Sequence, residues 1–83
     1  MSILVDQPRP VAFKQFKRTA HLASDTSVAE LHAFATRIGL KRSWYQAGTR
    51  AHYDLFDGKI DKALAAGAEL VSVRELLRRA VRE

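Results

Sequence analysis

Hydrophobic and polar residues alternate along the first part of the chain in a way typical of strands. Residues 3–5 form an aliphatic run that ends at Asp6 and the turn-forming residues 7–10, as expected for a short buried strand. Residues 11–17 fit neither a strand nor a helix pattern clearly, whereas residues 19–23 are compatible with a second strand. The N-terminal part therefore predicts two strands joined by a segment of undefined structure.

Three later segments combine a helix-start signal with apolar residues at helical spacing. Ser27 to Glu30 matches a capping box that opens a helix over about residues 28–38, which Gly39 ends. Asp57 is expected to cap a short helix, and Ser72 to Glu75 matches a second capping box that opens the last helix. The residues expected to face the core are Leu31, Phe34, Ala35 and Ile38, then Ile60, Ala63 and Leu64, and finally Val73, Leu76, Leu77, Ala80 and Val81.

The segments between these helices predict further strands and one polar loop. Residues 41–50 have the composition of a polar loop that carries two aromatic residues, whereas residues 52–55 alternate as in a strand and residues 69–71 suit another. Strands that alternate with helices predict a small α/β domain with a three- or four-stranded sheet and about three helices packed on it. A mostly helical fold is the alternative, and residues 1–83 are expected to form one domain.

The length and composition restrict the kinds of site that the domain can build. With 83 residues, the chain is too short for a deep enclosed active site, so we expect a surface groove or a site between two copies. The absence of cysteine excludes disulfides, thiolate ligands and a cysteine nucleophile. Short apolar runs and the lack of a signal-peptide pattern predict a cytoplasmic protein without a membrane role.

The charge of the chain favours anionic partners. Fourteen Lys and Arg against nine Asp and Glu give a net charge of +5, which attracts nucleotides, nucleic acids or acidic protein surfaces. A basic protein with no anionic partner is an equally good reading of the total charge, because binding depends on how the charge is distributed.

The three histidines are the best candidates for chemistry, because each has a carboxylate close by in the sequence. The pairs are His21 with Asp25, His32 with Glu30, and His52 with Asp54. On a strand, His52 and Asp54 project from one face and Tyr53 and Leu55 from the other. We predict a polar site made of His21, Asp25, His32, His52 and Asp54.

Two kinds of chemistry suit this set of residues. Imidazoles and carboxylates can bind Zn²⁺, Mn²⁺ or Fe²⁺ and activate water, so a divalent metal cofactor is one option. In the other, a carboxylate orients one imidazole as a general base without metal. Ser24, Thr26 and Ser27 are better explained as helix caps than as nucleophiles, which disfavours a nucleophilic hydrolase.

Cations and aromatic residues near this site suggest how a ligand is held. Arg37, Lys41, Arg42 and Arg50 are candidates to bind an anion, and Trp44 and Tyr45 to stack on a base. A binding-only alternative uses the basic last helix, with Arg74, Arg78, Arg79 and Arg82, although such a stripe is also typical of a solvated helix face. A small interaction protein that forms a homo-oligomer is the third alternative.

Several short segments of the chain together resemble a family of uncharacterised domains. They are residues 21–26, 30–35, 37–40, 44–46, 52–54 and 65–68, within a likeness that runs from residue 3 to the final helix. The set resembles the bacterial and phage domain-of-unknown-function family numbered 4031. The resemblance implies that Asp6, His21, Asp25, His32 and residues 52–54 form a recurring pattern, and it implies no activity.

The residues themselves lead to a functional prediction. We expect the His/Asp site to recognise a phosphate-containing ligand, either a nucleotide or a nucleic acid, with acid/base or metal-assisted hydrolysis as a hypothesis. The alternative is a non-enzymatic nucleic-acid-binding or protein-interaction module that uses the basic last helix. Whether the domain is an enzyme stays open at this point.

Overall fold

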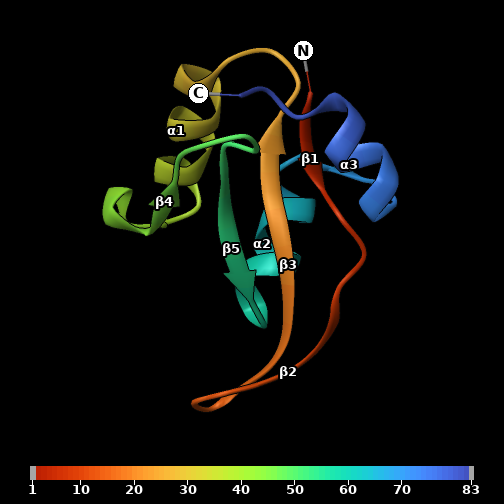
Figure 1. Ribbon diagram of the computed structural model, residues 1–83. Helices are drawn as coiled ribbons and strands as arrows, with labels where there is room; N and C mark the ends of the chain where they lie inside the picture. The colour runs from red at the N-terminus through yellow and green to blue at the C-terminus, as the bar shows by residue number, and fades with distance from the viewer. Residues whose placement is uncertain (1, 83) are drawn as a thin grey trace.

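The computed structural model describes residues 2–82, apart from the side chain of Phe13, and has a mixed sheet with helices on both faces (Figure 1). In chain order the elements are β1 (Ile3–Val5), β2 (Arg9–Phe13), β3 (Phe16–Ser24), α1 (Val28–Arg37), the 3-10 turn η1 (Arg42–Trp44), β4 (Tyr45–Gln46), β5 (His52–Phe56), α2 (Gly58–Ala65), β6 (Glu69–Leu70) and α3 (Val73–Arg79). The predicted α/β class and the three helices are confirmed. The sheet has six strands instead of three or four.

Strand β3 organises the sheet. The strands lie in the order β4-β5-β3-β1-β6, and β2 pairs with the first half of β3. All neighbours are antiparallel except β1 and β6, which are parallel. Because the nine-residue β3 pairs with β1, β2 and β5, its side chains lie next to residues from three other segments.

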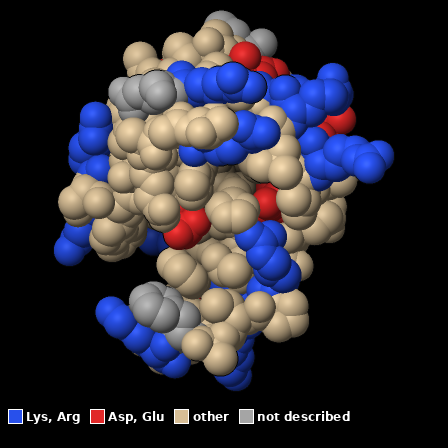
Figure 2. All heavy atoms as spheres, in the orientation of Figure 1, with Lys and Arg blue, Asp and Glu red and all other residues tan. Residues whose placement is uncertain are grey.

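The β2–β3 hairpin corrects the expected turn at residues 7–10 and resolves the undefined segment that followed. Pro8 and Pro10 suggest a turn, but Pro10 lies in an edge strand, where its missing N–H costs no sheet hydrogen bond. The hairpin extends away from the rest of the molecule, and Lys and Arg side chains gather on it (Figures 1 and 2). At its base, the Asp57 carboxylate accepts hydrogen bonds from the backbone N–H groups of Lys17 and Arg18, at 3.0 and 2.9 Å. Asp57 therefore holds the hairpin. The expected side-chain cap of α2 by Asp57 does not form.

The two faces of the sheet are covered unequally. Helices α1 and α2 cover one face and bury a core that includes Val5, Leu22, Tyr53 and Leu55; we call this the α1/α2 face. Helix α3 covers only part of the other face, where Leu76 packs with Leu4, Ala23 and Val71; we call this the α3 face. The remainder of the α3 face, over β3 and β5, is therefore left for polar side chains.

The helix cores match the predictions for α1 and α2 but not for α3. Leu31, Phe34, Ala35 and Ile38 are buried, as are Ile60 and Ala63, with Leu64 partly buried. In α3 only Leu76 is buried, whereas Val73 and Leu77 are 42% and 44% exposed. Val81 lies beyond the helix and is only partly buried. The reason is that a seven-residue helix at the edge of the sheet contacts it along a narrow line.

Both predicted capping boxes form only in part. The Ser27 and Ser72 hydroxyls accept hydrogen bonds from the backbone N–H groups of Glu30 and Glu75, each at 3.0 Å. The Glu30 carboxylate instead accepts a hydrogen bond from the Ser24 hydroxyl at 2.8 Å. The start of α1 is thereby tied to the end of β3.

Candidate functional site

Neighbouring strands bring two histidines and one aspartate together on the open part of the α3 face. His21 on β3 lies opposite Asp54 on β5, and His52 precedes Asp54 by two residues, so all three side chains project from the same face. The Asp54 Oδ1 atom is 3.7 Å from Nε2 of His21 and 3.5 Å from Nε2 of His52. We call these three residues the His–Asp cluster.

A buried carboxylate fixes the ring of His21. Asp6 has no solvent exposure, and its two oxygens accept hydrogen bonds from the ring Nδ1 and the backbone N–H of His21, at 2.7 and 2.8 Å. Burial raises the pKa of Asp6, but the hydrogen bonds from His21 and the charges of His21 and Arg9 outweigh it and leave that pKa lowered. An ionised Asp6 accepts a hydrogen bond from Nδ1–H, so in the neutral ring Nε2 carries the lone pair.

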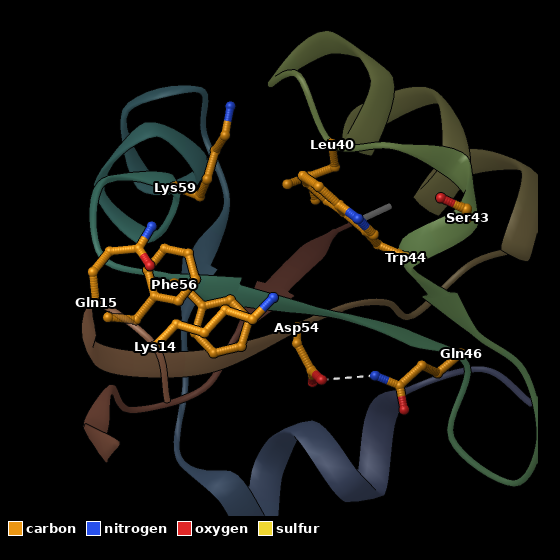
Figure 3. Close-up of a pocket in the computed structure, with 10 residues that line it drawn as sticks. Lys14, Gln15, Leu40, Ser43, Trp44, Gln46, Asp54, Phe56 and Lys59 are labelled. Carbon is orange, nitrogen blue, oxygen red and sulfur yellow. Dashed lines mark hydrogen bonds between the residues drawn. The ribbon is translucent and has the colours of Figure 1, made fainter. Parts of the chain in front are cut away.

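The other two members of the cluster are held in the same manner. Nδ1 of His52 donates a hydrogen bond to the carbonyl oxygen of Arg50 at 2.7 Å, because a carbonyl can only accept. The Gln46 amide on β4 donates to Oδ2 of Asp54 at 2.6 Å (Figure 3). Each residue of the His–Asp cluster thus has one polar atom held by a neighbour, while its second polar atom lies within 4.8 Å of those of the other two residues. Nε2 of His21 also lies 3.3 Å from a guanidinium nitrogen of Arg9.

The spacing of these atoms suits a metal ion better than direct hydrogen bonds. Distances of 3.5 and 3.7 Å are long for hydrogen bonds between a ring nitrogen and a carboxylate. Ligands about 2.1 Å from a tetrahedral Zn²⁺ lie about 3.4 Å from one another. One ligand atom from each residue lies within 4.8 Å of the other two. The His21, His52 and Asp54 side chains are 33%, 21% and 36% exposed, which leaves the shared point open to water and ligand.

Arg9 places a positive charge directly beside the cluster. One guanidinium nitrogen of Arg9 lies 2.9 Å from Nδ1 and 3.3 Å from Nε2 of His21, and another lies 3.5 Å from Asp6. Arg9 also lines a shallow hollow of about 500 Å³ that includes His21, Asp54 and Thr19. With 40% of its side chain exposed, Arg9 can contact an anion in this hollow.

A second hollow of about 660 Å³ opens on the other side of Asp54 (Figure 3). It exists because the two-residue β4 pairs only with the start of β5, so the edge of β5 after Tyr53 lies open. We call it the edge groove; its lining residues are Lys14, Gln15, Phe16, Leu40, Ser43, Trp44, Gln46, Asp54, Phe56 and Lys59. Asp54 is thus shared between the His–Asp cluster and the edge groove.

His32 lies on the opposite side of the sheet, so the three histidines do not converge. It projects from α1 to the α1/α2 face, where its Nδ1 is 2.8 Å from the Tyr53 hydroxyl. Its ring also packs edge-on against Tyr45, with ring centroids 4.5 Å apart. The Tyr53 side chain is buried, which raises its pKa. His32 belongs to an aromatic cluster of the core and has no access to Asp54.

Asp25 also lies away from the His–Asp cluster, and Asp6 takes the expected role of Asp25 beside His21. The Asp25 carboxylate accepts hydrogen bonds from the backbone N–H of Ser2 at 2.8 Å and from Arg79 at 3.0 Å. The hydrogen bond from Ser2 has the largest effect and the one from Arg79 the next; they lower the pKa of Asp25 to about 2. Asp25 therefore joins the N-terminal segment to α3.

Replacing Asp25 with asparagine is expected to reduce stability without affecting the His–Asp cluster. The lowered pKa means that the ionised carboxylate stabilises the fold above the unfolded value of 3.8, and that this stabilisation is lost as pH falls toward 2. We expect Asp25→Asn to lower the free energy of unfolding by about 1 kcal/mol at pH 7 and by much less at pH 2. Urea denaturation at both pH values measures this difference. A difference that does not depend on pH contradicts this role.

The predicted ligand-binding residues are distributed over several surfaces. Trp44 is 44% exposed and lines the edge groove, whereas Tyr45 packs against the core beside His32. The cations Arg37, Lys41 and Arg42 lie over the rings of Phe34, Trp44 and Tyr45, at 5.5, 5.7 and 5.2 Å from their centroids. Arg50 takes part in the site through its carbonyl oxygen. Of this group, Trp44 alone lines the edge groove.

Three residues that contact the cluster were not predicted as site residues. Asp6 had a signal in the sequence, since the family resemblance places it in one recurring pattern with His21, and the pairing of β1 with β3 brings the two together. Arg9 and Gln46 had no such signal, because each contacts the cluster through the pairing of its strand with the next strand of the chain.

Comparison with known proteins identifies a family but no characterised relative. A family model described as "Protein of unknown function (DUF4031)" matches residues 3–83. No curated protein and no solved structure matches the chain. Within residues 2–82, no helix has the length and apolar character needed to cross a membrane.

Proposed function

We propose that this chain, which belongs to the family of proteins of unknown function, binds a divalent metal ion at the His–Asp cluster and hydrolyses a phosphate ester there. The geometry of the site supports this proposal. The ligands are Nε2 of His21, Nε2 of His52 and Oδ1 of Asp54. Two imidazoles and one carboxylate suit Zn²⁺, Mn²⁺ or Fe²⁺.

One observation carries this proposal: every ligand is held by a second residue through its other polar atom. Asp6 holds His21, the Arg50 carbonyl holds His52, and Gln46 holds Asp54. Histidine and carboxylate ligands of metal sites are commonly oriented in this way, which fixes the ring tautomer and the direction of the lone pair. A general base without metal needs one such contact, so the three together favour a metal.

The open side of the cluster suits metal-assisted hydrolysis. A divalent ion held by His21, His52 and Asp54 would have a position left for water and would lower the pKa of that water toward neutrality. The ion would supply hydroxide to attack phosphorus; the ester P–O bond would then break, and the leaving alkoxide would take a proton from solvent. Arg9 is close enough to pair with the phosphate oxygens, where a guanidinium stabilises the negative charge.

The basic last helix is a weaker basis for function. Arg78 is paired with Glu75 at 2.7 Å, and Arg79 contacts Asp25 and Glu69 at 3.0 and 3.2 Å. These ion pairs neutralise part of the charge that a phosphate-binding helix needs. The ion pairs therefore favour the interpretation that this surface is a solvated helix face, which also joins α3 to the sheet, over a phosphate-binding surface.

A metal titration followed by NMR tests the proposal. Adding Zn²⁺ or Mn²⁺ to the wild-type protein is expected to change the ring signals of His21 and His52 and to leave those of His32 unchanged. Hydrolysis of bis(4-nitrophenyl) phosphate is expected with the metal and to stop when EDTA removes it. Equal effects on all three histidines, or none, contradict the metal site. Site-specific binding without hydrolysis contradicts the catalytic part.

A further inference from the structure

We propose that the phosphate ester is part of a single-stranded nucleic acid, with one unpaired base in the edge groove and the adjacent phosphate at the His–Asp cluster. This inference rests on the proposed function, since it names the substrate class of the same site. The ligand is then a flexible polyanion with exposed bases, in preference to a free mononucleotide or a duplex.

The edge groove has the chemistry of a base-binding site. Trp44 and Phe56 extend into it from opposite walls, from η1 and from the end of β5 (Figure 3). Phe56 is backed by Phe16, with ring centroids 4.7 Å apart and planes 23° from parallel. A flat apolar surface of this kind stacks with any base and contributes about 1–3 kcal/mol for each base bound. Gln46 adds an amide at the end of the groove near Asp54 (Figure 3).

The hairpin supplies a path for the phosphate backbone. Between Asp6 and Asp25 the chain has four cationic residues and no acidic one: Arg9, Lys14, Lys17 and Arg18. Lys14 and Lys17 are exposed, and Lys14 lines the edge groove, while Arg9 lines the shallow hollow beside His21. Figure 2 shows this concentration of positive charge on the hairpin. A charged strip that borders both hollows fits a chain of phosphates better than one phosphate group.

The placement of Asp54 links the two hollows. It is a member of the His–Asp cluster and also lines the edge groove, so a base in the groove has its own phosphate next to the cluster. A base can lie between Trp44 and Phe56 only when it is unstacked from its neighbours and unpaired. That requirement favours single-stranded over double-stranded nucleic acid.

The single tryptophan of the chain gives a direct test that needs no metal. We expect an octamer of deoxythymidine or of uridine to quench Trp44 fluorescence in the presence of EDTA, with an affinity that falls as salt rises. Thymidine monophosphate and a duplex of the same length are expected to bind at least about tenfold more weakly, because each loses either the backbone contacts or the unpaired base.

Variants separate the groove and the hairpin from other basic surfaces. Using a labelled octamer and fluorescence anisotropy, Trp44→Ala is expected to reduce affinity roughly tenfold. The pair Lys14→Gln and Lys17→Gln is expected to reduce the salt slope by about 1.4, from two lost phosphate contacts. Arg74→Gln on α3 is the matched control and is expected to leave affinity and salt slope unchanged.

The outcomes distinguish this inference from the proposed function. Metal-free octamer binding that depends on Trp44 and the hairpin lysines supports the inference whether or not the metal catalyses hydrolysis. Equal binding of monophosphate and octamer, or loss of binding in the Arg74 variant alone, overturns it. Metal binding and hydrolysis of the small phosphodiester without any octamer binding also overturn it, while the proposed function stands.

Discussion

Replacing His52 with alanine is expected to lower the affinity for Zn²⁺ or Mn²⁺ more than about a hundredfold and to abolish metal-dependent hydrolysis of a phosphodiester. The change removes one of three protein ligands, and a site left with two ligands holds the ion weakly. The His52 side chain is 21% exposed and lies on the incompletely covered α3 face, so the fold is expected to survive. Isothermal titration calorimetry with each metal measures the loss.

His32→Ala is the matched control for this prediction. It removes the same kind of side chain from the opposite face of the sheet, where the ring contacts the hydroxyl of Tyr53. We expect the His32 variant to be less stable, because the Tyr53 hydroxyl loses its partner in the core, and to keep the wild-type metal affinity. If the His32 and His52 variants lose metal affinity equally, the assignment of ligands is wrong.

Replacing Asp6 with alanine is expected to have the largest effect on stability, about 3–5 kcal/mol of the free energy of unfolding. Asp6 is fully buried and accepts hydrogen bonds from the ring and the backbone N–H of His21. Alanine leaves these groups without their acceptor and leaves Arg9 without a carboxylate 3.5 Å away. Urea denaturation followed by circular dichroism measures the change.

An exposed aspartate provides the comparison for Asp6. Asp61 pairs with Arg18 at 3.3 Å, but its side chain is 69% exposed. We expect Asp61→Ala to change stability by less than about 0.5 kcal/mol, because solvent screens the pair. Similar losses for the two variants contradict the buried role of Asp6.

A more conservative change separates the effect of Asp6 on the site from its effect on the fold. Asp6→Asn keeps the size of the side chain and one oxygen that can accept the hydrogen bond from Nδ1 of His21, while it removes the negative charge and the second acceptor oxygen. We expect metal affinity to fall about 10–100-fold in the folded Asn variant, as when an outer-shell partner of a histidine ligand is lost. An Asn variant that folds and binds metal as wild type contradicts the orienting role of Asp6.

The sequence predicted the local elements of this fold well where helical or alternating patterns were clear. The helix at residues 28–38, its apolar face and its stop at Gly39 follow from the apolar spacing, the capping residues and the tolerance of glycine for positive φ. The structure confirms them, and Gly39 has a positive φ. The alternation of residues 52–55 also predicted that His52 and Asp54 share one face of a strand. These features depend on neighbours along the chain, so the sequence alone carries them.

Strands β2 and β4 could not be predicted in this way, because pairing with the next strand of the chain decides them, and neither segment shows a strand pattern of its own. Pro10 argued for a turn, yet β3 supplies a partner that tolerates proline at the edge. Residues 45 and 46 have the composition of a loop, but in the structure they pair with β5, and that pairing directs Gln46 to Asp54.

The sequence by itself determined the α/β class, the helix faces and the sharing of one strand face by His52 and Asp54, since all of these depend on local periodicity. The tertiary structure alone decided which histidines meet. The register of β3 against β5 places His21 opposite Asp54, and the packing of α1 on the other face carries His32 away. The tertiary structure also makes Asp6, and not Asp25, the partner of His21, because the pairing of β1 with β3 places the end of β1 beside that histidine. Strand register is a long-range property, and side chains that lie near one another in the sequence can be directed to opposite faces of a sheet.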